Sequence, residues 1–216
     1  MTPVEYIDGY YFKRDDKYNV CGVKGGKARI GRLLAVGGRN DLVMGEYDPK
    51  SYNHWMSMLE RCYGGRVQGA YKDCSVCEEW MVFSGFNKWF NEQQYKCQEE
   101  YHLDKDILIK GNKVYSPETC CLVPPEINVS LTRRPKNNRD LPIGVYHSKN
   151  NKRFFAVIDV NRKQVRLGTF DTIEEAFLAY KKARESQIKT LADKYKDLID
   201  PHVYEALYNY KIEITD

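Results

Sequence analysis

The sequence predicts an α+β protein with a small β-rich N-terminal module, a mixed core of short strands and helices, and a C-terminal three-stranded antiparallel sheet plus a helix. Three observations lead to this prediction. Short β-rich runs between Gly, Asp and Asn turns fill residues 1–47. Residues 102–128 have the pattern of a strand, a turn, a second strand and a helix start. Residues 141–197 have the pattern of three short strands followed by a long helix.

The composition indicates a folded protein with reduced thiols and no membrane span. Hydrophobic residues make up 42% of the chain and aromatic residues 13%, which is typical of a globular protein. Seven cysteines are an odd number, which argues against a fully paired disulfide framework. No apolar run approaches the length that crosses a bilayer, and no basic start followed by an apolar run indicates a leader peptide. We therefore expect a cytoplasmic protein.

The first 64 residues contain the N-terminal module and the first clear helix. Residues 6–7, 10–12, 20–23 and 32–36 are predicted strands of a module whose role is open between a docking surface and a scaffold. A helix over residues 48–64 follows, because Trp55, Met58, Leu59 and Cys62 recur at helical spacing and Gly64 ends it. His54 lies off this apolar stripe, so we expect a surface side chain without a chemical role.

Two features precede the predicted hairpin. Residues 74–77 (CSVC) raise the question of zinc, but a structural zinc needs four ligands. The adjacent pair Cys120 and Cys121 suits one metal badly, so zinc is unlikely and buried free thiols are favoured. A second feature is a set of aromatic residues that we expect to pack in the core, namely Trp80, Phe83, Phe86, Trp89 and Phe90.

Residues 102–128 bring carboxylates and an amide together. A strand over residues 103–109 would alternate, with His102, Asp104 and Asp106 on one face and Lys105 on the other. Residues 110–113 form the turn, residues 120–123 the second strand, and Pro125 can open a helix that carries Asn128. Such oxygen ligands suit a divalent cation on a phosphodiester. The alternative is a structural hairpin whose acids pair with lysines of the turn.

Residues 50–133 resemble the HNH (ββα-metal) nucleases of the phage and intron homing-endonuclease kind, so we take residues 48–133 as an HNH-like domain. The resemblance implies that Asp104 and Asn128 hold Mg²⁺ or Mn²⁺. Lys105 stands where the family has a water-activating His, and Lys is a poor base at neutral pH. We take Lys105 as the first candidate to assist the attacking water, with Asp106 and His102 as rival catalytic residues. Two residues are assigned to fixing the turn: Asn112, and Thr119 at the usual place of the loop Asn.

The C-terminal part begins with a basic linker at residues 134–140. Residues 133–166 contain ten Lys or Arg against Asp140 and Asp159, which favours a polyanion as partner, although a solvated surface is an equal alternative. The third strand leads into a helix for which Thr172 and Glu175 form a capping box. Residues 198–216 form a C-terminal tail with a helix that starts at Pro201.

The strings at residues 144–145 (GV), 154–158 (FFAVI), 167–172 (LGTFDT) and 174–176 (EEA) resemble the Apetala/ethylene-response-factor DNA-binding domain. The resemblance covers most of residues 141–197 and implies a sheet whose open face enters the major groove. Alternation directs Phe154, Ala156 and Ile158 toward the helix. The DNA-contacting residues that we then expect, including two where the basic linker begins, are Arg133, Arg134, Tyr146, Ser148, Lys149, Arg153, Phe155, Gln164 and Arg166.

Together these resemblances predict a metal-dependent HNH-like endonuclease that binds duplex DNA and hydrolyses one of its phosphodiesters. If the chain is phage-encoded, it would act in the cytoplasm of a bacterial host. The alternative is a catalytically dead HNH-fold protein that binds DNA as a regulator or a counter-defence factor. A third possibility is an RNA-binding protein. The oligomeric state, the target sequence and the cut pattern are left open.

Overall fold

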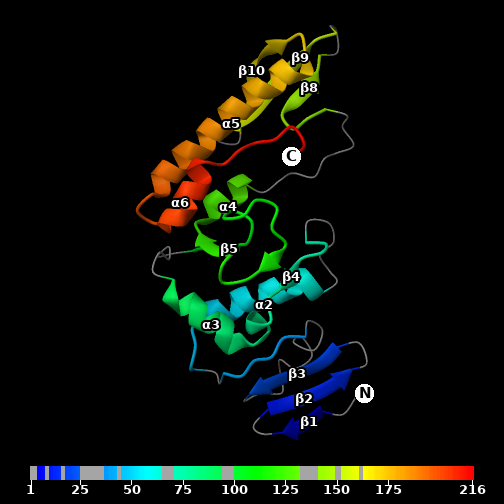
Figure 1. The fold of residues 1–216 in the computed structure, drawn as a ribbon, viewed down its shortest axis with the longest axis vertical. Helices are drawn as coiled ribbons and strands as arrows, with labels where there is room; N and C mark the ends of the chain where they lie inside the picture. Colours follow the sequence, from blue (N-terminus) through cyan, green and yellow to red (C-terminus); the bar gives the residue numbers. More distant parts are fainter. Residues whose placement is uncertain are drawn as a thin grey trace. The chain divides into compact units, whose positions relative to one another are not determined.

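The computed structural model describes residues 4–7, 10–15, 18–24, 37–42, 45–64, 71–93, 100–131, 141–148, 152–160 and 163–216. It confirms the α+β class (Figure 1). The chain divides into two compact units, Met1–Val123 and Pro124–Asp216. The boundary after Val123 lies inside the predicted domain of residues 48–133 and differs from our predicted boundaries at residues 47, 133, 140 and 197.

The N-terminal strands form a three-stranded antiparallel sheet. Strands β1 (Val4–Ile7), β2 (Tyr10–Asp15) and β3 (Tyr18–Lys24) follow one another in the order β1-β2-β3. The first three predicted strands of this module are therefore present. The fourth, at residues 32–36, lies outside the described residues.

Helix α2 (Pro49–Tyr63) matches the predicted helix closely. The side chain of Asp48 accepts a hydrogen bond from the Lys50 N–H at 2.8 Å and caps the N-terminus. Pro49 occupies the first turn, where its missing N–H has no intrahelical partner to lose. The apolar stripe is buried as expected, with Trp55, Met58 and Leu59 fully enclosed.

The core of the first unit is aromatic. Trp80, in the 3-10 turn η2 (Glu79–Met81), lies 4.7 Å between ring centroids from Trp89 of helix α3 (Phe83–Glu92). The Trp55 indole N–H donates to the Trp80 carbonyl at 2.7 Å. All five predicted aromatic residues are buried, which confirms their packing role.

Residues 37–42 join this core, although we assigned them to the N-terminal module. Arg39 forms a parallel bridge with Val82, and the Asp41 carboxylate accepts the Ser84 N–H at 2.9 Å. Added bulk at Gly38 would overlap Leu59, since a Cβ there would lie 2.4 Å from its side chain. The core therefore starts earlier than the helix periodicity indicates.

Two short two-stranded sheets carry the candidate site. Strands β4 (Ser75–Val76) and β6 (Val114–Tyr115) pair in parallel, which we did not predict. Strands β5 (His102–Asp104) and β7 (Cys121–Val123) pair antiparallel, with Leu103 opposite Leu122. Five cysteines are free thiols: Cys74, Cys120 and Cys121 are buried, and Cys62 and Cys77 are half-buried.

The second unit contains the predicted C-terminal sheet and helix. Strands β8 (Val145–His147), β9 (Phe154–Val160) and β10 (Lys163–Phe170) are antiparallel in the order β10-β9-β8. Helix α5 (Ile173–Tyr195) begins with both hydrogen bonds of the predicted capping box. The first strand starts later than residue 141, and the third is longer than predicted and contains a bulge between Arg166 and Gly168.

Helix α5 packs against one face of this sheet (Figure 1). Ala156 and Ile158 are buried toward it as alternation predicts, whereas Phe154 is only half-buried and lies beside the His147 ring at 4.8 Å. Gly144 has φ +76°, and a Cβ there would lie 2.1 Å from the Tyr180 ring of α5. Only glycine allows the chain to pass this close to the helix.

Two short helices are attached to α5. Helix α4 (Pro125–Leu131) is held by Glu126, whose carboxylate accepts from the Lys194 ammonium and, at 2.6 Å, from the Tyr195 hydroxyl. Helix α6 (Pro201–Tyr208) starts at the predicted proline and buries Val203 and Leu207. Both helices therefore belong to the second unit.

Candidate functional site

Strand β5 ends at Asp104 because the side chain of this residue captures the following backbone. One carboxylate oxygen, Oδ1, accepts the N–H groups of Asp106 at 2.8 Å and Ile107 at 2.9 Å. Such a local hydrogen bond offers the backbone an alternative to the strand ladder. The predicted strand over residues 103–109 is therefore wrong in length, and Asp106 lies in a bend, not on the strand face of Asp104.

Asp104 and Asp106 form a closely spaced pair of acids. Burial, reinforced by the negative charge of Asp106, raises the pKa of Asp104 to about 6, against the opposing effect of the two N–H donors. Asp104 is half-buried and Asp106 is exposed. The first unit thus holds two carboxylates whose mutual repulsion a cation would relieve.

Lys105 has a structural environment. Its side chain is buried, with a residue exposure of 7%. The ammonium Nζ lies 3.4 Å from Asp106 Oδ2 and 5.9 Å from the centre of the Tyr115 ring. The amine of Lys105 is thus enclosed by its own unit and engaged with a neighbouring carboxylate, which is the environment of a structural residue.

Asn112 and Thr119 tie the loop together. The Asn112 amide donates to the carbonyls of Lys105 and Val114, both at 2.7 Å, and its oxygen accepts the Val114 N–H at 3.2 Å. The Thr119 hydroxyl donates to the same Val114 carbonyl at 2.7 Å. The loop that follows the two acids is consequently fixed at several backbone points.

Arg61 is a neighbour of Asp104 that our reading of the sequence missed. Burial acts to lower its pKa, but Tyr71, a hydrogen bond with Tyr115 and the charge of Asp104 outweigh it, so the pKa of Arg61 is raised. Its guanidinium carbon lies 5.5 Å from the centre of the Tyr71 ring. The signal was present in the spacing of Lys50, His54 and Arg61, which returns to one side of a helix after four and seven residues.

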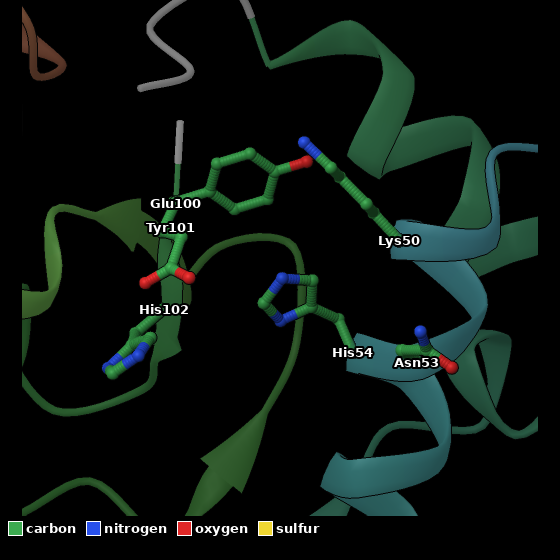
Figure 2. A pocket seen from close by; sticks show the side chains of 6 residues that line it. All are labelled: Lys50, Asn53, His54, Glu100, Tyr101 and His102. Carbon is green, nitrogen blue, oxygen red and sulfur yellow. The ribbon is translucent and has the colours of Figure 1, made fainter. Parts of the chain in front are cut away.

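A cleft of about 300 Å³ opens between α2 and the segment that enters β5. Figure 2 shows Lys50 and His54 extending from α2 toward the segment that carries Tyr101 and His102. The six lining residues are Lys50, Asn53, His54, Glu100, Tyr101 and His102. His102, one of the predicted rival bases, thus lies at the edge of this cleft.

His54 contradicts our expectation of a plain surface residue. Its ring is half-buried and stacks on Tyr101, with centroids 5.2 Å apart and planes at 15°. Burial, together with the charges of Arg61 and His102, lowers the pKa of His54 to about 4. The imidazole is therefore neutral at pH 7, and it shares a cleft with a histidine 48 positions later in the sequence.

Asn128, the second predicted metal ligand, lies in α4 of the second unit. Asp104 belongs to the first unit, and a joint role in holding one metal stays a prediction. Within the described ranges, three or more His, Cys, Asp or Glu side chains do not converge on any point where they could hold an ion.

The open face of the C-terminal sheet carries a stack of three side chains. Tyr146 of β8 stacks on Phe155 of β9 at 5.4 Å and 17°, and the Arg166 guanidinium of β10 lies 4.4 Å from the centre of the Phe155 ring. Arg166 also donates to the Thr169 hydroxyl at 2.9 Å. Residues three apart face opposite sides of a regular strand, and the bulge at Leu167 brings these two to the same side.

The other residues predicted to contact DNA differ in whether their side chains are exposed or already paired. The Arg153 Nε lies 2.7 Å from Asp171 Oδ1, so this guanidinium is paired at the surface. Gln164 is exposed and Ser148 is half-buried. Three further predicted contacts lie outside the described residues: Arg133, Arg134 and Lys149.

Comparisons with protein-family models, with curated proteins and with solved structures found no match for this chain. A search of the described residues for helices of membrane-spanning length and hydropathy also returned none. The geometry of the chain itself is therefore the basis of the functional argument.

Proposed function

We propose that the protein is a metal-dependent nuclease that hydrolyses a phosphodiester of duplex DNA. One observation carries the proposal: the carboxylates of Asp104 and Asp106 lie next to each other at the end of β5, two residues after His102, which lies at the edge of an open cleft. Carboxylates beside an imidazole are the groups that metal-assisted hydrolysis requires.

The donor set fits a hard divalent cation. Mg²⁺ keeps several waters and is commonly bound by one or two carboxylates together with substrate phosphates. Asp104 and Asp106 supply two such carboxylates; burial first and the charge of Asp106 second raise the pKa of Asp104, and a bound cation would counteract both effects. When bound, Mg²⁺ or Mn²⁺ would stabilise negative charge on the phosphate and the leaving oxygen.

His102 is the residue that we assign as general base. Its position two residues before Asp104 puts both side chains on the same face of β5. A ring nitrogen of His102 would accept the proton of the attacking water. Lys105 would instead hold Asp106 in place through its ion pair.

The sheet of the second unit supports a role in binding DNA. Arg166 is exposed and is oriented by both Phe155 and Thr169, and a fixed guanidinium can recognise a guanine edge with two hydrogen bonds. Phosphate contacts would come from the basic segments around it.

Nicking of supercoiled DNA with Mg²⁺ or Mn²⁺ tests the proposal. We expect metal-dependent nicking that is reduced to background by Asp104→Asn and by about 100-fold or more by His102→Ala. Glu92→Gln, a change at an exposed carboxylate at the end of α3, is the matched control and should keep full activity. Wild-type protein that nicks no better than Asp104→Asn with any DNA or metal would contradict the proposal.

A second candidate function is DNA binding by a catalytically dead HNH fold. The burial and pairing of Lys105, at the position where the family has its active histidine, favour it. It predicts DNA binding that is unchanged by Asp104→Asn, with no nicking by any variant. A gel-shift comparison of duplex DNA, single-stranded DNA and RNA would also test the RNA-binding alternative.

A further inference from the structure

The cleft between α2 and the segment entering β5 holds side chains that the proposed hydrolysis does not use. Lys50, Asn53 and His54 reach it from α2, and Tyr101 precedes His102 on its other side (Figure 2). Its volume of about 300 Å³ is roughly ten times the space that one water occupies in the liquid. The cleft is therefore large enough for a tetrahedral oxyanion and part of the group attached to it.

The lining is rich in hydrogen-bond donors. An ammonium group supplies three N–H donors, an amide supplies two, and an imidazole supplies at least one. Of the six lining residues, only Glu100 carries a carboxylate, and it is exposed to water. Lys50 is also exposed, so its ammonium can reach a ligand at the mouth of the cleft. Many donors and one movable carboxylate suit a ligand with several acceptor oxygens, such as a phosphate.

The position of the cleft relative to the acids is set by β5. His102 and Asp104 lie two residues apart on one strand face, which separates their Cα atoms by about 6.8 Å. This is close to the spacing of neighbouring phosphates along a nucleic-acid strand. A strand whose scissile phosphate lies at Asp104 would therefore present its next phosphate to the cleft.

We infer that this cleft is a phosphate subsite, in which Lys50, Asn53 and His54 bind the phosphodiester next to the scissile one. The inference rests on the proposed nuclease function for the identity of the ligand. It assigns a substrate-positioning role to the side of α2 opposite its buried stripe. The negative charge of Glu100, which lines the same cleft, repels the phosphate and lowers its affinity.

Inorganic phosphate is the first probe, added to the full chain while the imidazole C–H signals of His54 are followed by NMR. We expect saturable shifts, with binding weakened about fivefold by Lys50→Gln and strengthened up to about fivefold by Glu100→Gln. Both side chains are exposed, so the two variants should melt like the wild type. Reversed signs, with phosphate binding strengthened by Lys50→Gln and weakened by Glu100→Gln, would overturn the inference, and so would an absence of shifts.

Duplex DNA with a single uncharged methylphosphonate linkage is the second probe, and it is applied only if nicking is observed. Binding to the Asp104→Asn protein is measured with the neutral linkage placed next to the cut position. The neutral linkage should weaken binding, and Lys50→Gln should remove most of that difference. Equal loss with and without Lys50 would overturn the subsite while leaving the nuclease proposal intact. Phosphate binding with the expected signs but no nicking on any DNA would contradict the nuclease proposal alone.

Discussion

Charged residues are buried or hydrogen-bonded in the loop after β5, whereas they are exposed on the open face of the β8–β10 sheet. In the loop, Asp104 is tied by two backbone N–H groups and Lys105 is buried against Asp106. On the sheet, Arg166 and Gln164 are exposed along a strand of eight residues. The difference shows that alternation predicts side-chain direction in an uninterrupted ladder, as at Ala156 and Ile158 of β9, and fails where a side chain ends its own strand or a bulge interrupts it.

The two regions also differ in how their glycines are constrained, and this gives the largest expected effect. Gly144→Ala places a methyl group 2.1 Å from the Tyr180 ring at φ +76°, so we expect the second unit to lose about 3 kcal/mol or more. Gly111→Ala in the β5–β6 loop has a similar φ of +81° but open space around it. It should cost only about 1 to 2 kcal/mol.

Urea unfolding can separate these two effects. All three tryptophans lie in the first unit, so their fluorescence follows that unit, while far-ultraviolet circular dichroism also follows α5. Gly144→Ala should shift the dichroism transition and leave the fluorescence transition in place. A common shift of both signals would mean that the two units unfold together, so that the effect of Gly144→Ala is not confined to the second unit.

The next effect concerns the two arginines of the sheet. Arg166→Ala should weaken DNA binding by about tenfold and reduce the slope of affinity against salt by about one. Arg153→Ala should change affinity less, because Asp171 already pairs with that guanidinium. Asp171→Asn is the matched variant and should increase the contribution of Arg153. Equal losses for the two arginines in gel shifts across a salt series would show that pairing with Asp171 does not matter.

The smallest effect is a pH dependence of stability at His54. The folded-state pKa of His54 is about 4, below its ordinary value of 6.5, so the unfolded chain binds the proton first as the pH falls. Its contribution to the free energy of unfolding is present above pH 6.5 and is lost between pH 6.5 and 4. His54→Gln should therefore be less pH-sensitive than the wild type in this range.

The contribution of His54 is measured as the difference between the unfolding midpoints of the wild type and His54→Gln. Asp104, whose pKa is raised, acts in the opposite direction, since its contribution is lost as the pH rises from about 4 to 6. Because wild type and His54→Gln both contain Asp104, its effect cancels in the difference of their unfolding midpoints. A difference that stays constant from pH 7 to pH 4 would show that His54 is not held neutral.

Local signals predicted much of the fold. Thr172 with Glu175 marks the start of α5, because helix capping involves residues only a few positions apart. The apolar stripe of α2 was also predicted from the sequence, because the buried residues of a helix recur at helical spacing.

The candidate site was less predictable because its neighbours come from distant segments. Arg61 approaches Asp104, and His54 meets His102, across more than forty residues of sequence. No single window contains both partners of either pair. The capture of the Asp106 N–H by Asp104 is local, but the same residues also fit an alternating strand. The segment is too short for its pattern to distinguish a strand that continues past Asp104 from a strand that ends there.

The attachment of α4 to α5 decides where this protein can be cut for study. A fragment that begins at residue 141 would leave Lys194 and Tyr195 without the carboxylate of Glu126, and Arg184 without the carbonyl of Ser130. A fragment that begins at Pro124 retains these contacts. Expression trials, crystallisation and labelling of the C-terminal half should therefore start ahead of this short helix, well before the basic linker suggests a boundary.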